Sequence, residues 1–166
     1  MSAYRLSDAE LFFGRQRAIT ELIRHLARDR LTILHAESGA GKSSLLQAGL
    51  MPRLLGQGHL PVYLRSDISP SLAIKQAFVP DLADVPELHK ISLPGFLRQV
   101  TAVLGLTTHL YLLLDQFEEV YTLLNETERA SFLDELGKCL NDQALSRVHW
   151  VLAVRSEFFS NISDLY

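Results

Sequence analysis

The sequence predicts an α/β fold, a parallel sheet flanked by helices, and three observations support this. Short apolar runs alternate with segments of helical periodicity along the chain. The runs are almost continuous in apolar residues, which is typical of parallel strands buried on both faces. The chain has 166 residues, of which 48% are hydrophobic and 21% charged, so it is long enough for one domain around one core.

The individual elements follow from periodicity and capping signals. Residues 16–28 predict a helix, because apolar side chains recur on one face. The next helix begins at Lys42 and is expected to end near Pro52, since proline has no N–H to donate to the preceding turn. Residues 69–105 hold two crossover helices, and Asn125 with Glu128 forms a capping box for a further helix. The predicted strands are residues 31–35, 60–67, 110–115 and 148–154.

Composition excludes several classes of protein. The net charge of −3 provides no basic field to attract nucleic acid or anionic lipid, so a nucleic-acid motor is disfavoured. A single cysteine, Cys139, rules out a disulfide framework and a multi-cysteine zinc site. The six histidines are expected to be structural, because none lies four residues from another. No apolar run is long enough for a membrane span and no secretion signal is present, so we expect a cytoplasmic protein.

The stretch "AESGAGKS", residues 36–43, matches a phosphate-binding loop between a strand and a helix. The small residues Gly39, Ala40 and Gly41 allow the backbone to curl so that its N–H groups point inward at a polyphosphate. The start of the following helix adds further free N–H groups and the positive end of the helix dipole. A plain glycine turn beside a solvated lysine is the alternative interpretation.

The side chains that follow the loop suit the same ligand. Lys42 is expected to reach the β- and γ-phosphates, Ser43 to ligate Mg²⁺ and Ser44 to touch the α-phosphate. Ala36 stands where the pattern has its first glycine. An alanine at positive φ costs about 1–2 kcal/mol, so we expect Ala36 to keep a negative φ at the end of its strand.

A second motif supports the first. In "YLLLD" the apolar run ends at Asp115, as expected for a central strand whose terminal aspartate holds Mg²⁺ through water. The alternative is that Asp115 caps a helix after a core strand. Together with the glycine loop, the metal-binding interpretation is favoured.

With these motifs in place, the sequence resembles the STAND class of P-loop ATPases, and within it the bacterial novel STAND NTPase family. Four stretches carry the resemblance in order along nearly the whole chain: "FFGRQRAITELI", "SGAGKSSLLQAGLMP", "YLLLDQFEEVYTLL" and "VLAVRSEFF".

The resemblance implies roles for particular residues. Phe13, Gly14 and Arg15 would pack near the adenine and ribose, although Gly14 and Arg15 also read as a turn before a helix, and Gln16 stands where the family has glutamate. Arg155 would contact the γ-phosphate, the alternative being a surface ion pair with Glu157. The implied nucleotide-binding set is completed by Glu37, Ser38, Gly39, Ala40, Gly41, Lys42, Ser43 and Ser44.

Two glutamates are candidates for the residue that orients the attacking water. Related ATPases place a glutamate directly after the aspartate, but this chain has Gln116 there. If a helix follows Asp115, Glu118 and Glu119 fall at i+3 and i+4 and point back toward the strand tip. The alternative is a solvated acidic start to a helix, which the helix dipole favours.

The resemblance implies a switch in signal transduction and bacterial defence, in which bound ADP keeps the protein closed and ATP permits self-association. Residues 1–30 would form an N-terminal arm and helix, and residues 31–166 the NTPase core. We expect a fragment that lacks a fifth strand, helical lid, winged helix, sensor and effector, which would leave the edge of the strand at 31–35 uncovered. A small-molecule P-loop kinase and a nucleotide-binding module without hydrolysis are the alternative functions.

Overall fold

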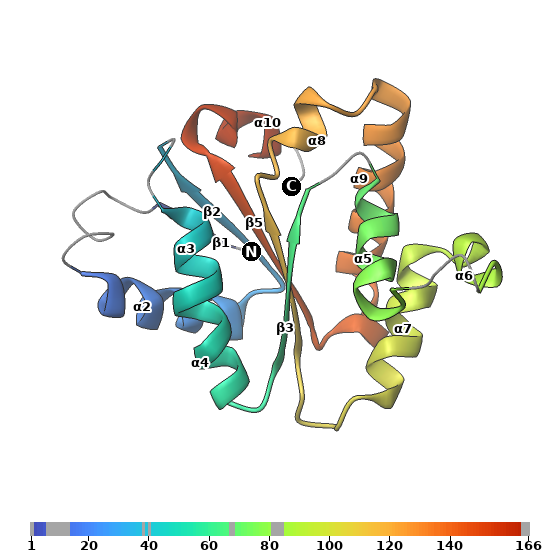
Figure 1. The fold of residues 1–166 in the computed structure, drawn as a ribbon, viewed down its shortest axis with the longest axis horizontal. Coiled ribbons are helices and arrows are strands. Elements are labelled where there is room, and N and C mark those ends of the chain that lie inside the picture. Colours follow the sequence, from blue (N-terminus) through green and yellow to red (C-terminus); the bar gives the residue numbers. More distant parts are fainter. Residues whose placement is uncertain are drawn as a thin grey trace.

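The computed structural model describes residues 2–5, 14–37, 39, 41–66, 69–80 and 85–163. It shows a five-stranded, fully parallel sheet with helices on both faces (Figure 1). The strand order is β1-β2-β5-β4-β3. The strands are β1 (Ser2–Arg5), β2 (Leu31–Ala36), β3 (Leu60–Arg65), β4 (Leu110–Asp115) and β5 (Val148–Arg155).

The four predicted strands are all present, and a fifth was missed. β1 pairs in parallel with β2 from Ser2 opposite Thr32 to Arg5 opposite His35. The expectation of an uncovered edge along residues 31–35 is therefore wrong. Four residues with one buried side chain, Tyr4, carry too little hydrophobic pattern to predict a strand from sequence.

One face of the sheet is covered by α2 (Arg15–Arg28) and by the helical segment that follows the glycine loop. This segment comprises α3 (Lys42–Ser44), a π-helical stretch (Leu45–Leu50) and α4 (Met51–Gly56). The expected end near Pro52 is wrong. At the end of the π-helical stretch the N–H of Met51 donates to the carbonyl of Leu46, five residues back, whereas an α-helix bonds four residues back. Pro52 then lies in the first turn of α4, where a helix needs no N–H donor.

The other face carries the remaining helices. The largest core cluster lies beneath them and includes Trp150, Phe117 and Phe132, all at most 3% exposed. The capping box of Asn125 and Glu128 is confirmed at the start of α9. None of the helices that the structure describes is long and apolar enough to cross a membrane. These helices are α5 (Pro70–Phe78), α6 (Glu87–Lys90), α7 (Leu93–Val103), α8 (Glu119–Thr122), α9 (Glu126–Asn141) and α10 (Phe159–Ser163).

The connections leave neighbouring strands toward opposite faces. After β2 the chain passes to α3 on one face, and after the adjacent β5 it passes to α10, whose Ile162 packs in the cluster on the other face (Figure 1). In open α/β sheets the crevice at the carboxyl ends of two such strands is the usual place for a ligand. The glycine loop begins at this point.

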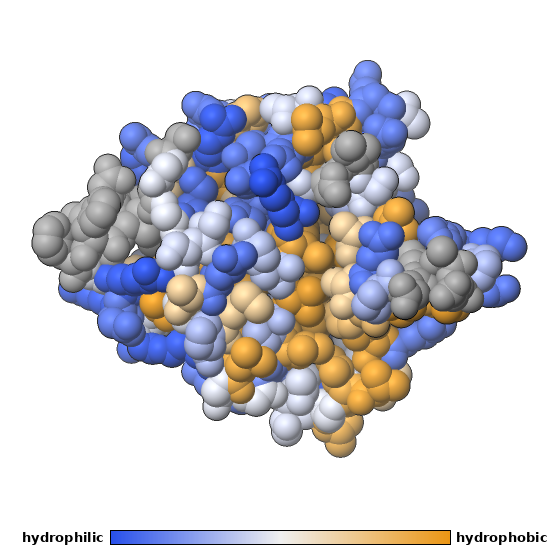
Figure 2. All heavy atoms as spheres, viewed as in Figure 1, coloured by the Kyte–Doolittle hydropathy of each residue, from blue (hydrophilic) through white to orange (hydrophobic). Residues whose placement is uncertain are grey.

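The strand β3 forms the other edge of the sheet. Leu60 at its start and Ser66 just after its end donate N–H groups to the carbonyls of residues 109 and 115, so the odd-numbered residues between them direct their N–H groups outward. Pro61 lies on the outward side, where proline is tolerated and where it blocks pairing with another chain. Figure 2 shows apolar surface over β3 between α4 and α5. Val103 and Leu106, after α7, are 84% and 91% exposed.

Three histidines at the amino ends of β3, β4 and β5 form a hydrogen-bonded group that their sequence spacing did not indicate. His149 Nδ1 is 3.0 Å from the Asp29 carbonyl and must donate to it, so His149 Nε2 is the acceptor for His109 Nδ1 at 2.7 Å. His59 Nδ1 accepts the backbone N–H of His109. The described residues hold no group of three or more His, Cys, Asp or Glu side chains arranged to bind a metal ion.

These contacts predict a loss of stability in mild acid. Burial lowers the pKa of both His109 and His149, and a second proton on His149, at Nε2, would face the N–H that His109 directs at that atom. A histidine with a lowered folded-state pKa contributes its full stability above the unfolded-state pKa, near 6.5. We therefore expect the free energy of unfolding, measured by urea denaturation, to fall as pH decreases from 7 to 5.

The variant His109→Gln should show a shallower pH dependence over this range. His89→Gln is the matched control, because His89 is exposed and should leave the slope unchanged. An equal slope in wild type and His109→Gln would contradict the assignment.

Candidate active site

The glycine loop follows β2 and has the backbone conformation that its glycines permit. Gly39 and Gly41 have φ values of 76° and 80°, and nothing lies within 4 Å of where either Cβ would be, so conformation rather than space requires glycine there. Gln116 is the one non-glycine residue with positive φ in the described parts of the chain. The expectation that Ala36 keeps a negative φ is confirmed.

Backbone donors are available where a phosphate would lie. In the described residues, the amides of Gly41, Lys42 and Ser43 make no turn or loop hydrogen bond to a carbonyl. The first N–H groups of a helix also have no acceptor within the helix. Together with α3 and the residues that continue it to Gly56, these donors create a favourable position for an anion.

The ammonium group of Lys42 turns back onto the loop. Its Nζ donates to the carbonyls of Ala36 at 3.1 Å and Glu37 at 3.2 Å. Burial lowers the pKa of Lys42, while the carboxylates of Glu118 and Asp115 oppose this shift. The half-buried cation is thus close to two carboxylates, with which it has no direct ion pair among the described contacts.

Asp115 ends the interior strand β4 and is only 1% exposed. Its Oδ2 accepts hydrogen bonds from the hydroxyls of Ser43 and Tyr63, the latter at 2.7 Å, and its Oδ1 accepts the backbone N–H of Gln116 at 2.8 Å. Oδ2 thus receives two hydroxyl protons and Oδ1 receives one backbone N–H. Burial and the bond to Asp115 raise the pKa of Tyr63 to about 12, which keeps the phenol in its donor form.

A magnesium ion fits these residues. A buried carboxylate beside a hydroxyl at the start of the glycine-loop helix is a hard oxygen set, and Mg²⁺ binds such sets through one or two carboxylates together with substrate phosphates. Because the Ser43 hydroxyl donates its hydrogen bond to Asp115, the lone pairs of its oxygen can coordinate a metal ion.

The backbone at Gln116 separates the two glutamates. Gln116 has a φ of 51°, and the next N–H, of Phe117, donates to Ala153 on β5. The condition under which both glutamates would follow directly in a helix is therefore not met, and α8 begins at Glu119. Gln116 follows the strand in the left-handed conformation, and Glu118 and Glu119 are directed toward different partners.

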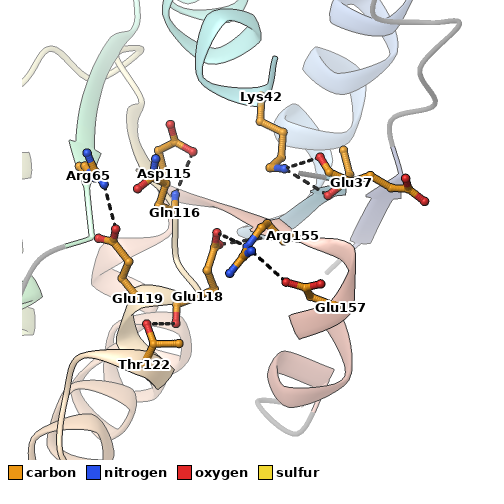
Figure 3. A network of polar contacts seen from close by, with 11 residues as sticks. Glu37, Lys42, Arg65, Asp115, Gln116, Glu118, Glu119, Thr122, Arg155 and Glu157 are labelled. Carbon is orange, nitrogen blue, oxygen red and sulfur yellow. Dashed lines mark hydrogen bonds and ion pairs between the residues drawn. The ribbon is translucent and has the colours of Figure 1, made fainter. Parts of the chain in front are cut away.

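Each glutamate has its own arginine (Figure 3). Glu118 is buried and accepts Arg155 Nε at 3.2 Å, while Glu119 pairs with Arg65 at 3.0 Å on the exposed end of β3. Lys42, Asp115, Glu118 and Arg155 lie near one another and come from three parts of the chain: the glycine-loop helix, the end of β4 with the turn after it, and β5 (Figure 3).

Arg155 makes a second ion pair, with Glu157 at 3.0 Å. The surface pair considered from sequence is thus present, alongside a buried one with Glu118. Arg155 Cζ also lies 5.2 Å from the centre of the Phe158 ring, which helps to fix the guanidinium at the mouth of the site.

The N-terminal motif contacts the glycine-loop helix. Arg15 donates to the carbonyl of Ser44 at 2.7 Å and to its hydroxyl at 3.3 Å, directly after Gly14. Gln16, in the place of the family glutamate, accepts from Arg53 at 2.7 Å and thereby joins α2 to α4. The expected nucleotide contacts of Phe13, Ser38 and Ala40 lie outside the described residues.

Two residues of the site were missed from the sequence, Tyr63 and Arg65. The register of β3 against β4 places Arg65 opposite Asp115 and Tyr63 opposite Leu113. Alternation along β3 does put both on one face, but which face meets Asp115 depends on a strand pairing that the sequence leaves open.

The molecule also has a cavity of about 630 Å³ between α5 and α9, and no residue of the glycine loop lines it. Two of its ionic groups, Lys75 and Glu135, are engaged within the protein. Lys75 donates to the carbonyls of Leu88 and Ile91, and Glu135 accepts from Ser71 and from the backbone of Leu93.

The parallel sheet, the helices on both faces and the glycine loop at its switch point place the chain among α/β proteins whose fold is compatible with that of P-loop NTPases. The family model described as Novel STAND NTPase 1 matches residues 1–166, the whole chain, and the chain belongs to this family. No characterised protein and no solved structure matches it significantly.

The positive φ of Gln116 yields a stability prediction. The left-handed conformation costs a non-glycine residue about 1–2 kcal/mol and costs more for a β-branched one. We expect Gln116→Val to lower the free energy of unfolding by about 1–2 kcal/mol, and Gln116→Gly to leave it unchanged or raise it by up to about 1 kcal/mol. Urea denaturation measures both, and a glycine variant less stable than the valine variant would contradict the strain.

Proposed function

We propose that the chain is the ATP-binding, slowly hydrolysing domain of a nucleotide-controlled switch. The observation that carries the proposal is the hydrogen bond from Ser43 to the buried Asp115, at the start of the helix that follows the glycine loop. Membership of the novel STAND NTPase 1 family supports the NTPase part of the proposal.

Different residues would bind the phosphates and the Mg²⁺ ion. The amides around Gly41 and the Lys42 ammonium would hold the β- and γ-phosphates, exchanging loop carbonyls for phosphate oxygens. Ser43 and Asp115 would hold Mg²⁺, which when bound neutralises charge on the phosphates. Arg15, already on Ser44, would lie toward the α-phosphate side of the loop.

Of the two glutamates, Glu118 is the better candidate to orient the attacking water. It is buried beside Arg155 and near Lys42, whereas Glu119 is directed toward Arg65 at the edge of the sheet. Glu118 is paired with Arg155, so we expect hydrolysis to need Arg155 to leave Glu118 for the γ-phosphate. This requirement supports a slow turnover.

Self-association and coupling to other domains of a longer protein are part of the same proposal. They rest on the family alone, because the ADP-closed and ATP-open states of the switch would differ in contacts beyond this chain. A sedimentation experiment on the full-length protein with ADP and with a non-hydrolysable ATP analogue tests them directly.

A nucleotide-binding module without hydrolysis is the second candidate. It is favoured by one observation: each glutamate after Asp115 is tied to an arginine, Glu118 to Arg155 and Glu119 to Arg65. Binding of ATP with no phosphate release from the wild-type protein would select this candidate.

Binding depends on Lys42 in both candidates. Hydrogen bonds to charged groups contribute about 1.5–3 kcal/mol, so Lys42→Ala should weaken ATP binding about 10-fold to 100-fold, measured with a fluorescent ATP analogue. Asp115→Ala should weaken binding mainly in the presence of Mg²⁺. Lys138→Ala is the control, since Lys138 pairs with Asp134 on the surface of α9, and a Lys42→Ala protein with unchanged affinity would refute the site.

Hydrolysis should distinguish the two glutamates. We expect Glu118→Gln to reduce the rate of phosphate release at least about 10-fold while ATP affinity is retained, because general-base catalysis contributes about 10²–10⁴-fold. Glu119→Gln should change the rate less than about 3-fold. Single-turnover phosphate release measures both rates, and the reverse order would assign the role to Glu119.

A further inference from the structure

We infer that Tyr63 is a positioning residue that makes the site select Mg²⁺ over Ca²⁺, an inference that rests on the proposed nucleotide site. The feature that carries it is the convergence of two hydroxyls on one oxygen of Asp115. Ser43 and Tyr63 both donate to Oδ2, and Tyr63 does so at 2.7 Å.

The acceptor capacity of Asp115 is distributed unevenly. A carboxylate offers about four acceptor positions, two on each oxygen. Oδ2 receives two hydroxyl protons and is filled, whereas Oδ1 receives only the backbone N–H of Gln116. The carboxylate therefore has one acceptor position left, on one oxygen, and cannot offer both oxygens to a cation.

Strand pairing and core packing hold Tyr63 in position. It lies on β3, opposite Leu113 in the parallel pairing with β4, and packs against the core cluster beneath α2 and α4. A tyrosine on a paired strand loses little further freedom when its hydroxyl bonds, so it holds the orientation of the Asp115 side chain more firmly than a mobile residue would.

This distribution suits one alkaline-earth ion better than the other. Mg²⁺ keeps several of its waters and needs few direct protein ligands, whereas Ca²⁺ takes six to eight oxygens and often both oxygens of one carboxylate. Because Tyr63 and Ser43 occupy Oδ2, Asp115 can act as a ligand with one oxygen, which suits Mg²⁺, but it cannot bind Ca²⁺ with both oxygens. Without the phenol, Oδ2 regains a free acceptor position and the carboxylate gains freedom to turn.

The test compares metal affinities of wild type and Tyr63→Phe in the presence of a fluorescent, non-hydrolysable ATP analogue. Each protein is titrated with Mg²⁺ and, separately, with Ca²⁺, and the fluorescence gives two apparent dissociation constants. Loss of a residue that orients a metal ligand typically costs 10-fold to 100-fold in metal affinity. We expect Tyr63→Phe to weaken Mg²⁺ at least about 10-fold and Ca²⁺ less than about 3-fold.

Tyr121→Phe is the matched control, because it removes a phenol that bonds to the Asn161 carbonyl away from Asp115. A general loss of structure would weaken both ions together, so the ratio of the two constants reports positioning alone. An unchanged ratio in Tyr63→Phe overturns the inference.

The wild-type protein provides a second measurement that needs no variant. If wild type binds Ca²⁺ as tightly as Mg²⁺ with the nucleotide analogue, the inference is wrong even if Tyr63→Phe does not fold. If wild type binds no nucleotide with either ion, the proposed function fails and the inference with it. Nucleotide binding that depends on Lys42 but shows no Mg²⁺ preference leaves the proposed function intact.

Discussion

The site depends on the hydrogen bonds that satisfy one buried carboxyl group. Asp115 is 1% exposed at the tip of the interior strand β4, and an unpaired charge there would cost several kcal/mol. Hydrogen bonds from three separate parts of the chain satisfy it: Ser43 from the glycine-loop helix, Tyr63 from the edge strand and the backbone after Asp115 itself. The same contacts therefore hold the glycine-loop helix in place on the sheet.

The left-handed conformation of Gln116 determines what surrounds that carboxylate. By taking a φ of 51°, Gln116 turns its N–H back onto Asp115 and allows Phe117 to rejoin β5. Phe117 anchors the turn in the core, so the next two residues diverge, Glu118 toward β5 and Glu119 toward β3. One strained residue thus gives two adjacent carboxylates different partners, as strained residues often do at functional sites.

Local signals predicted what depends on local structure. The strand ending at Asp115, the capping box at Asn125 and the backbone of the glycine loop follow from patterns within a few residues. Features set by pairing between distant segments escaped prediction: β1 beside β2, the three clustered histidines and the register that brings Tyr63 to Asp115. The helix through Pro52 escaped for another reason, because a π-helical stretch shifts the hydrogen-bond register just before the proline.

The cations around the site have internal partners that a phosphate would have to replace. Lys42 bonds to two loop carbonyls, and Arg155 is shared by Glu118 and Glu157. A nucleotide that engages Lys42 exchanges neutral acceptors for a charged one, which is a net gain. Engaging Arg155 instead requires breaking a buried ion pair, and that leaves Glu118 without its cation. Under the proposed function, binding of the phosphates and release of Glu118 would therefore be separable steps, and only a ligand with a group that reaches Arg155 would favour the second one.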